Sequence, residues 1–261
     1  MIFLVFIILL TIGYTFLFNL IGLSLWFNFL WVFVSFIGSI LTTVLIVEIM
    51  FLFMAKGKPT GKFRHFLMHQ ACWLILAFSG VKVKIEGKEY VPNETFVCYA
   101  NHKSYFDPVI LYYTFGKVCS AVGKVELFKI PFVKQLAKVY GVIGLDRNNN
   151  RAGAKAIIEG VKLIKSGLSM MIFPEGGIKD RNNEEMVNLR AGAYKLVTKS
   201  EVLLLPVSIN GSSKIRSKKI FSKAIVNVVV HKPISKEEYE NMTTLEIGNM
   251  VQDLLNDDLH S

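Results

Sequence analysis

Apolar and polar positions divide this 261-residue chain into two regions. The first 47 residues carry no charged side chain, and the apolar run continues to Ala55 with only Glu48 interrupting it. One helix over this stretch would be about 80 Å long, whereas the hydrocarbon core of a bilayer is about 30 Å thick. The residues that mark a turn are Asn19, Gly22, Ser24 and Asn28. The pattern over 1–55 therefore predicts a hydrophobic helical hairpin in the membrane, with spans at 2–18 and 29–54.

A cleavable signal peptide fits this first region less well. No basic residue precedes the apolar run, and no small-residue cleavage site with a polar start follows it. Residues 56–79 instead predict a basic linker and a short helix. Four basic residues fall within 56–64, and the positive-inside rule places this flank, with the region that follows, on the cytoplasmic face of an integral cell-membrane protein. Phe66–Phe78 is too short to span, so it lies either in the interface or against the core.

From residue 80 onward, short apolar stretches alternate with amphipathic ones, with no long linker and no repeat. The predicted strands are Val81–Glu86, Thr95–Ala100, Val118–Val122, Val142–Asp146, Ser169–Phe173, Leu203–Ile209 and Ala224–Val230. The clearest helices are Ala152–Lys165, Arg190–Lys199 and a carboxy-terminal helix that begins at Ser235, where Ser235 and Glu238 match a capping box. Residues 80–261 therefore predict one α/β domain, a mixed β-sheet flanked by helices.

Charge separates the same two regions. All thirty Lys and Arg residues follow Ala55, and the net charge of the whole chain is +10. Nucleic acid suits such a charge, but no nucleic-acid motif is present, and the hairpin makes anionic membrane lipid the simpler partner. The G-x-S-x-G elbow, the phosphate-binding P-loop and the H-E-x-x-H motif are missing, so hydrolase, ATPase and metalloprotease chemistry lose support. No metal site is indicated.

One His-Asp pair indicates acid–base chemistry. His102 has Asp107 five residues later, and no other histidine has an aspartate at that spacing. A carboxylate on one imidazole nitrogen fixes the tautomer and stabilises the imidazolium that forms when the other nitrogen takes a proton. The predicted strand ends at Asn101 and Pro108 favours a helix start, so a tight turn between them can bring the pair together. The alternative is that Asp107 only caps the helix and His102 is an ordinary loop residue.

Four blocks of the sequence resemble those of the glycerolipid acyltransferase family, which includes the 1-acyl-sn-glycerol-3-phosphate acyltransferases. The first block is met by Asn101, His102, Ser104 and Asp107, the second by Gly141–Arg147, the third by Phe173, Pro174, Glu175 and Gly176, and the fourth by Leu205–Ile209. Lys124–Pro131 and Arg190–Ala193 resemble two further family segments. The order and spacing of these blocks on a basic chain with an apolar hairpin make the resemblance specific over roughly residues 80–215.

The resemblance implies acyl transfer from acyl-CoA or acyl-carrier protein to the sn-2 hydroxyl of 1-acyl-sn-glycerol-3-phosphate (lysophosphatidate), with no cofactor. His102 would be the general base and Asp107 its orienting carboxylate. The residues implied in substrate binding are Asn101, Ser104, Lys124, Arg147, Phe173, Pro174, Glu175, Gly176 and Arg190. The cations among them would hold the phosphate, with solvated surface charges as the alternative. Glu175 would bind a hydroxyl of the acceptor or brace its loop, while Pro174 and Gly176 shape the turn.

The third block departs from the family pattern. Its usual continuation is Thr-Arg, whereas Gly177 and Ile178 stand at these positions. That arginine is thought to hold the acceptor's phosphate, so either Lys179, Arg181 or Arg190 replaces it, or the acceptor is not lysophosphatidate. A sister enzyme that acylates glycerol 3-phosphate or another lysolipid therefore stays open. A lipid-binding scaffold would not need the His-Asp pair, and a hydrolase would release free fatty acid.

Overall fold

The computed structural model describes residues 2–21, 28–54, 61–146, 150–178, 183–187, 189–217 and 222–260. The chain forms two compact units, Met1–Gly57 and Lys58–Ser261.

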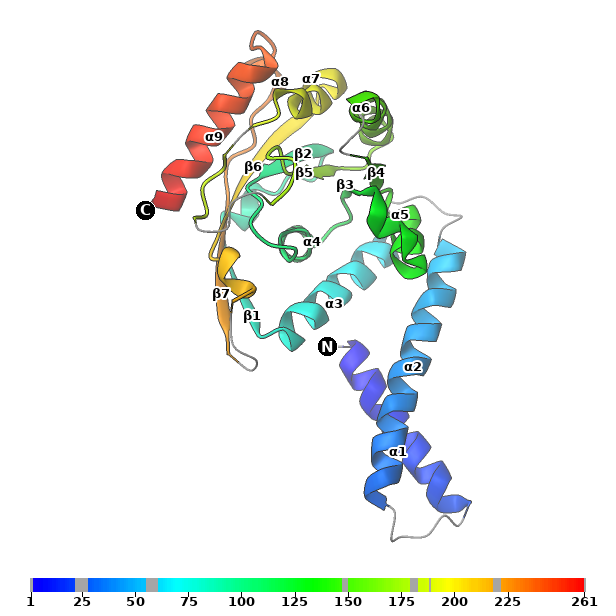
Figure 1. Ribbon diagram of the computed structural model, residues 1–261. Helices are drawn as coiled ribbons and strands as arrows, with labels where there is room; N and C mark the ends of the chain where they lie inside the picture. The colour runs from blue at the N-terminus through cyan, green and yellow to red at the C-terminus, as the bar shows by residue number, and fades with distance from the viewer. Residues whose placement is uncertain are drawn as a thin grey trace. The chain divides into compact units, whose positions relative to one another are not determined.

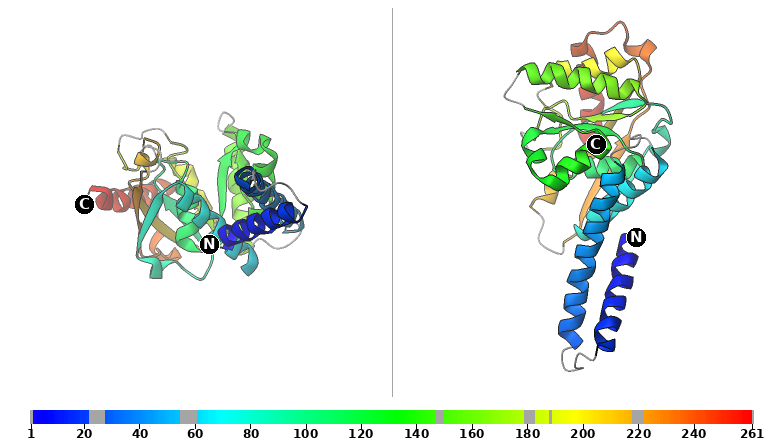
Figure 2. Two further views of the ribbon diagram at one scale, coloured as in Figure 1. Left: turned by 90° about the horizontal axis from the view of Figure 1, so that it is seen from below. Right: turned by 90° about the vertical axis from the view of Figure 1, so that its right-hand side faces the viewer.

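The first unit is a helical hairpin of α1 (Ile2–Leu20) and α2 (Asn28–Met54) (Figure 2). Polar side chains meet between its helices: the Thr11 and Ser39 hydroxyls are 2.8 Å apart, and the Tyr14 and Thr42 hydroxyls are 2.9 Å apart. Many apolar side chains of both helices are exposed. Polar contacts inside and apolar side chains outside are typical of helices packed in lipid. The two helices predicted for this unit are present among its described residues.

The two helices differ in length of apolar sequence. Leu30–Met50 of α2 is long and apolar enough to cross a bilayer, whereas the apolar stretch Val5–Leu20 of α1 is shorter. The linker predicted from residue 56 lies mostly outside the described residues, which resume at Gly61.

The second unit begins with α3 (Lys62–Phe78). The side chains that α3 buries are spaced four residues apart and are Arg64, Met68, Cys72 and Leu76. The guanidinium of Arg64 donates to the Val139 carbonyl at 2.7 Å. By contrast, Phe63, Phe66 and Phe78 are exposed. The sequence was compatible with either an interfacial helix or a core helix. The helix α3 combines features of both, because one of its faces is buried in the domain while large apolar side chains on it remain exposed.

Seven strands form one sheet in the order β1-β7-β6-β2-β5-β3-β4 (Figure 1). Their bounds are β1 Val81–Glu86, β2 Phe96–Ala100, β3 Ser120–Lys124, β4 Ile143–Leu145, β5 Met170–Ile172, β6 Leu203–Asn210 and β7 Ala224–Val230. β6 and β7 pair antiparallel, whereas every other neighbouring pair is parallel. The predicted mixed sheet and all seven predicted strands are therefore confirmed, with bounds that shift by at most two residues.

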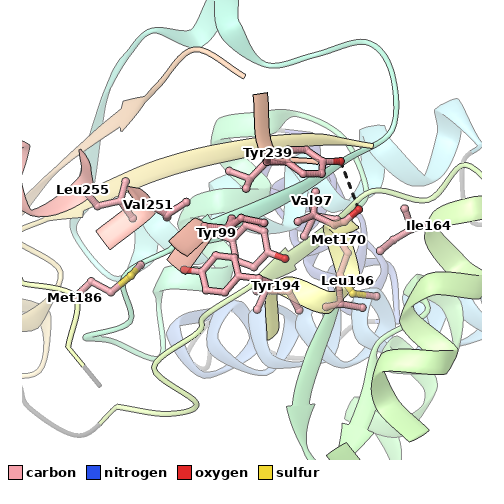
Figure 3. Packing of buried hydrophobic residues seen from close by; sticks show 14 of the residues in the cluster. Val97, Tyr99, Ile164, Met170, Met186, Tyr194, Leu196, Tyr239, Val251 and Leu255 are labelled. Atoms are coloured by element: carbon pink, nitrogen blue, oxygen red, sulfur yellow. Dashed lines mark hydrogen bonds between the residues drawn. The ribbon is translucent and has the colours of Figure 1, made fainter. Parts of the chain in front are cut away.

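Helices cover both faces of this sheet (Figure 1). The remaining helices are α4 Asp107–Phe115, α5 Pro131–Tyr140, α6 Asn150–Lys165, α7 Lys195–Ser200, α8 Lys236–Tyr239 and α9 Thr244–His260. The face under α6 to α9 holds a cluster of buried residues in which Tyr99 stacks on Tyr194 at 4.4 Å (Figure 3). The hydroxyl of Tyr99 donates to Ala193, and that of Tyr239 to Val202. These hydrogen bonds pair the buried hydroxyls of Tyr99 and Tyr239, whereas the buried hydroxyl of Tyr194 has no partner among the described residues.

Two predicted helices differ from the structure. The segment expected to be helical from Arg190 begins with a 3-10 turn, η4 (Ala191–Tyr194), before α7. The helix expected from Ser235 starts there with the predicted capping box, but it ends at Tyr239 and α9 begins at Thr244. The amide of Thr243 donates to the Glu246 carboxylate and the Glu246 amide to the Thr243 hydroxyl, a second capping box that starts a new helix.

Candidate active site

Two turns that lie about seventy residues apart in the sequence meet at one edge of the sheet. β2 and β5 are parallel neighbours in which Tyr99 pairs with Ile172. Both strands therefore end at the same edge, and the turns that begin at Asn101 and Phe173 leave it side by side. The carboxyl edge of parallel strands is where α/β folds commonly bind their ligands.

His102 and Asp107 form the pair that their spacing predicts. The Nδ1 atom of His102 is 2.9 Å from Oδ2 of Asp107, and the imidazole stacks on the Phe173 ring at 4.2 Å. The carboxylate is fully buried, whereas 13% of the His102 side chain is exposed. Because Asp107 accepts a hydrogen bond from Nδ1, Nε2 is the nitrogen that remains for proton transfer.

Asp107 also closes the turn before α4. Its Oδ2 atom accepts the backbone amides of Lys103 at 2.7 Å and Ser104 at 2.8 Å. The Ser104 hydroxyl accepts the Phe106 amide at 3.2 Å, so this side chain serves the turn. Asp107 therefore orients the imidazole and closes the turn, but it does not cap α4, whose N-cap residue is Phe106 and which has no side-chain cap hydrogen bond.

Glu175 is fully buried, and both of its oxygens contact the protein. Oε1 accepts the His102 amide at 2.7 Å, and Oε2 lies 3.0 Å from the ammonium of Lys103. The Val187 amide approaches Oε2 at 3.4 Å. Of the two roles expected for Glu175, these contacts favour bracing the loop over binding an acceptor hydroxyl. Lys103, which the sequence did not single out, is the buried counter-charge.

Asn101 is equally committed to the protein. Its amide nitrogen donates to the carbonyls of Glu184 and Ile209, and its oxygen accepts the Ile209 amide, each at 2.8 Å. These bonds join the end of β2 to the end of β6 and to the 183–187 segment. The geometry therefore favours a structural role for Asn101 over the substrate contact that the resemblance implied.

A mainly apolar cavity of about 280 Å³ adjoins the pair. His102, Phe173, Pro174 and Gly176 line it, as four of the residues expected to bind substrate or catalyse. The residues that the sequence did not identify come from β3, β4, α6 and α7 and include Val122, Leu145, Gly153, Ala156, Ile157 and Leu196. The small residues Gly153 and Ala156 of α6 were the available signal, since they leave room beside the helix.

Arg190 also lines the cavity and packs on the third block. A Cβ atom at Gly176 would lie 2.3 Å from Nε of Arg190, so only glycine leaves room for the arginine. The φ angles of Gly176 (72°) and Gly177 (144°) also require glycine. Along the described part of the cavity wall, Arg190 is the one Lys or Arg side chain.

The other predicted cations are not brought to the described cavity wall. Lys124 ends β3, its side chain is 54% exposed, and it pairs with Glu126 at 3.3 Å. Arg147, Lys179 and Arg181 lie outside the described residues.

A second Ser-His-Asp group does not have the geometry of a catalytic triad. His231 Nε2 lies 3.0 Å from the Ser208 hydroxyl and 2.9 Å from Asp258 Oδ2, so both partners use the same nitrogen. A triad needs the carboxylate on one nitrogen and the nucleophile on the other. Ser208 is buried, and this group holds β6, the end of β7 and α9 together.

The chain is similar in sequence to known proteins. The model of the Acyltransferase family matches residues 82–210. The chain is 30% identical over 198 residues to the 1-acyl-sn-glycerol-3-phosphate acyltransferase of Borreliella burgdorferi, covering 72% of this chain and 78% of that protein. It is 27% identical over 176 residues to the 1-acyl-sn-glycerol-3-phosphate acyltransferase of Saccharomyces cerevisiae, covering 66% and 57%.

A solved structure supports the same fold. The crystal structure of the 1-acyl-sn-glycerophosphate acyltransferase PlsC from Thermotoga maritima superposes with a TM-score of 0.67 at 22% identity, covering 76% of this chain and 79% of that one. The mixed sheet with its flanking helices is therefore a known architecture.

Proposed function

The chain belongs to the acyltransferase family, and we propose that it transfers a fatty acyl group from acyl-CoA or acyl-carrier protein to the sn-2 hydroxyl of 1-acyl-sn-glycerol-3-phosphate. The observation that carries this proposal is the His102–Asp107 pair, whose imidazole lines an apolar cavity. Such a site offers one base and room for an acyl chain. The names of the related enzymes support the choice of acceptor.

In the proposed reaction, Nε2 of His102 takes the proton of the acceptor hydroxyl while its oxygen attacks the thioester carbonyl carbon. Asp107 holds Nδ1 and stabilises the imidazolium that results. The tetrahedral intermediate then collapses, the carbon–sulfur bond breaks, and the leaving thiolate takes the proton back from His102. The acceptor attacks directly, so this route needs no acyl-enzyme.

The negative charge on the former carbonyl oxygen needs a donor. The Gly176 amide is used within its own turn, since it donates to the Phe173 carbonyl at 3.0 Å. Gly177 follows it, lines the same cavity and has no partner for its amide among the residues that the structure describes. We assign the donor role to the Gly177 amide; one such donor contributes about 3 to 4 kcal/mol to the transition state.

The apolar cavity is the proposed site of the donor's acyl chain, and Gly153 offers a direct test. A Cβ atom at Gly153 would have no atom within 4 Å, so a larger side chain enters open space. Gly153→Leu is expected to lower the preference for long over short acyl donors by about ten- to a hundredfold, because each excluded methylene forfeits about 0.8 kcal/mol. The measurement is kcat/KM for a series of acyl-CoA lengths.

Ala154→Leu is the matched control, because Ala154 is the next residue of the same helix and is exposed. Gly153→Leu raises helix propensity and Ala154→Leu lowers it only slightly, so neither should disrupt α6, and a change of chain-length preference in Gly153→Leu alone reports on the cavity. An unchanged chain-length profile in Gly153→Leu would place the acyl chain elsewhere.

Arg190 is the proposed ligand of the acceptor's phosphate, in place of the arginine that the third block lacks. An arginine fork matches a phosphate better than the point charge of lysine. Arg190→Ala is expected to raise KM for lysophosphatidate by about 10- to 100-fold, the loss of one charge-assisted hydrogen bond, with Arg190→Lys in between. The measurement compares lysophosphatidate with a phosphate-free monoacylglycerol acceptor.

The comparison of acceptors separates two roles of Arg190. A phosphate ligand affects lysophosphatidate alone, whereas a structural role at Gly176 lowers both activities equally. Arg216→Ala, at an exposed position, is the control for a general loss of positive charge. If the wild-type chain prefers glycerol 3-phosphate or another lysolipid, the departure at Gly177 and Ile178 decides the acceptor and only the reaction class stands.

The hairpin of α1 and α2 is the proposed membrane anchor, with the catalytic unit on the cytoplasmic face. Leu30–Met50 supports it by length and composition. An acceptor and a product that carry acyl chains are costly to move through water, at about 0.8 kcal/mol per methylene. An anchored enzyme meets both in the membrane, and its basic residues attract anionic lipid.

A further inference from the structure

His102 and Lys103 are linked to the same two carboxylates in a crossed pattern. The His102 ring hydrogen-bonds to Asp107, and the His102 backbone amide donates a hydrogen bond to Glu175. The Lys103 backbone amide donates a hydrogen bond to Asp107, and the Lys103 ammonium pairs with Glu175. The four contacts span 2.7 to 3.0 Å. The carboxylate from α4 and the carboxylate from the turn after β5 are therefore joined through two consecutive residues.

The charged side chains in this arrangement are buried, so their charges interact strongly with one another. The side chains of Lys103 and Glu175 are both 0% exposed, as is that of Asp107. Two buried carboxylates thus lie next to His102, which contacts each of them. Charges that are shielded from water interact more strongly, and an uncompensated negative charge would favour the protonated imidazole. A protonated imidazole cannot act as a base.

We infer that Lys103 is a positioning residue for His102. Its ammonium neutralises Glu175, so this carboxylate holds the His102 backbone in place without adding a second negative charge beside the imidazole. His102 then faces one uncompensated carboxylate, that of Asp107. This inference rests on the proposed function, because it concerns the base of that reaction.

The charged groups around His102 are few in the part of the chain that the structure describes. Asp107 contacts its ring, the Lys103–Glu175 pair contacts its backbone, and Arg190 lines the same cavity. A substitution in the Lys103–Glu175 pair therefore changes the net charge near His102 while Asp107 and Arg190 remain. A purely structural brace would tie these residues together but would not set the pH dependence of the reaction.

The test measures kcat/KM against pH for the full-length wild type, Lys103→Met, Glu175→Gln and the double variant. Lys103→Met leaves Glu175 uncompensated, which favours imidazolium, so the acid limb is expected to move up by about one pH unit. Glu175→Gln leaves the ammonium uncompensated and should move the same limb down. The double variant restores a net charge of zero and should return the limb toward the wild-type position.

Controls separate this result from a loss of fold. Lys236→Met breaks the exposed Lys236–Glu201 pair, which has a similar distance of 2.9 Å, and should leave the profile unchanged. Thermal unfolding is followed for each variant; if Lys103→Met does not fold, Glu175→Gln and the double variant alone carry the comparison. Identical pH profiles in all folded variants would overturn the inference. A wild-type chain that acylates no lysolipid would instead contradict the proposed function.

Discussion

Replacing His102 with alanine is expected to lower kcat for acyl transfer by about 10²- to 10⁴-fold, the usual contribution of a general base. The imidazole is held by Asp107 at 2.9 Å and stacked on Phe173, and it lines the cavity in which the thioester is proposed to bind. Among the residues that line the described part of the cavity, His102 is the one whose side chain can act as a base. The measurement is the initial rate of phosphatidate formation from lysophosphatidate and acyl-CoA.

His69→Ala is the control for this substitution, because His69 lies in α3 and stacks on Tyr113 rather than lining the cavity. Its activity should stay near that of the wild type. Thermal unfolding of both variants shows whether either loses the fold. Activity of His102→Ala within about tenfold of the wild type would mean that another group removes the proton.

Asp107→Asn is expected to lower kcat by about 10²- to 10³-fold with a smaller change in KM. An amide oxygen can still accept the three hydrogens that now converge on Oδ2, so the turn is retained. The amide carries no charge, so it cannot stabilise the imidazolium. Loss of a carboxylate at the first turn of α4 should also lower stability, by about 1 kcal/mol.

The control for Asp107→Asn is Asp253→Asn on the exposed face of α9. This change removes the same charge far along the chain and should affect neither rate nor unfolding by more than about 0.5 kcal/mol. If Asp107→Asn lowers the unfolding temperature but keeps its rate, Asp107 serves only the turn before α4.

Much of the domain fold could be predicted because its strands are short apolar runs bounded by polar or glycine-containing turns. All seven were placed, and the turn that joins His102 to Asp107 followed from one strand end and Pro108. The break before α9 was missed although Thr243 and Glu246 repeat the pattern of Ser235 and Glu238. A capping box inside a continuous polar stretch is easily assigned to the preceding helix.

The site was harder to predict where it depends on contacts between distant segments. Nothing in the sequence pairs Lys103 with a glutamate about seventy residues later; their contact arises because β2 and β5 are parallel neighbours. Glu175 and Asn101 were expected to bind substrate, yet their hydrogen bonds are made within the protein. The cavity was missed because its walls come from many elements that are separate in the sequence.

The most direct test of the central claim is acyl transfer by the purified full-length chain in detergent, with lysophosphatidate, glycerol 3-phosphate and neutral lysolipids offered in parallel. We expect lysophosphatidate to be acylated at the sn-2 hydroxyl, with release of one free thiol for each phosphatidate formed. Free fatty acid in place of phosphatidate would show a hydrolase. Acylation of none of these acceptors would contradict the proposed function.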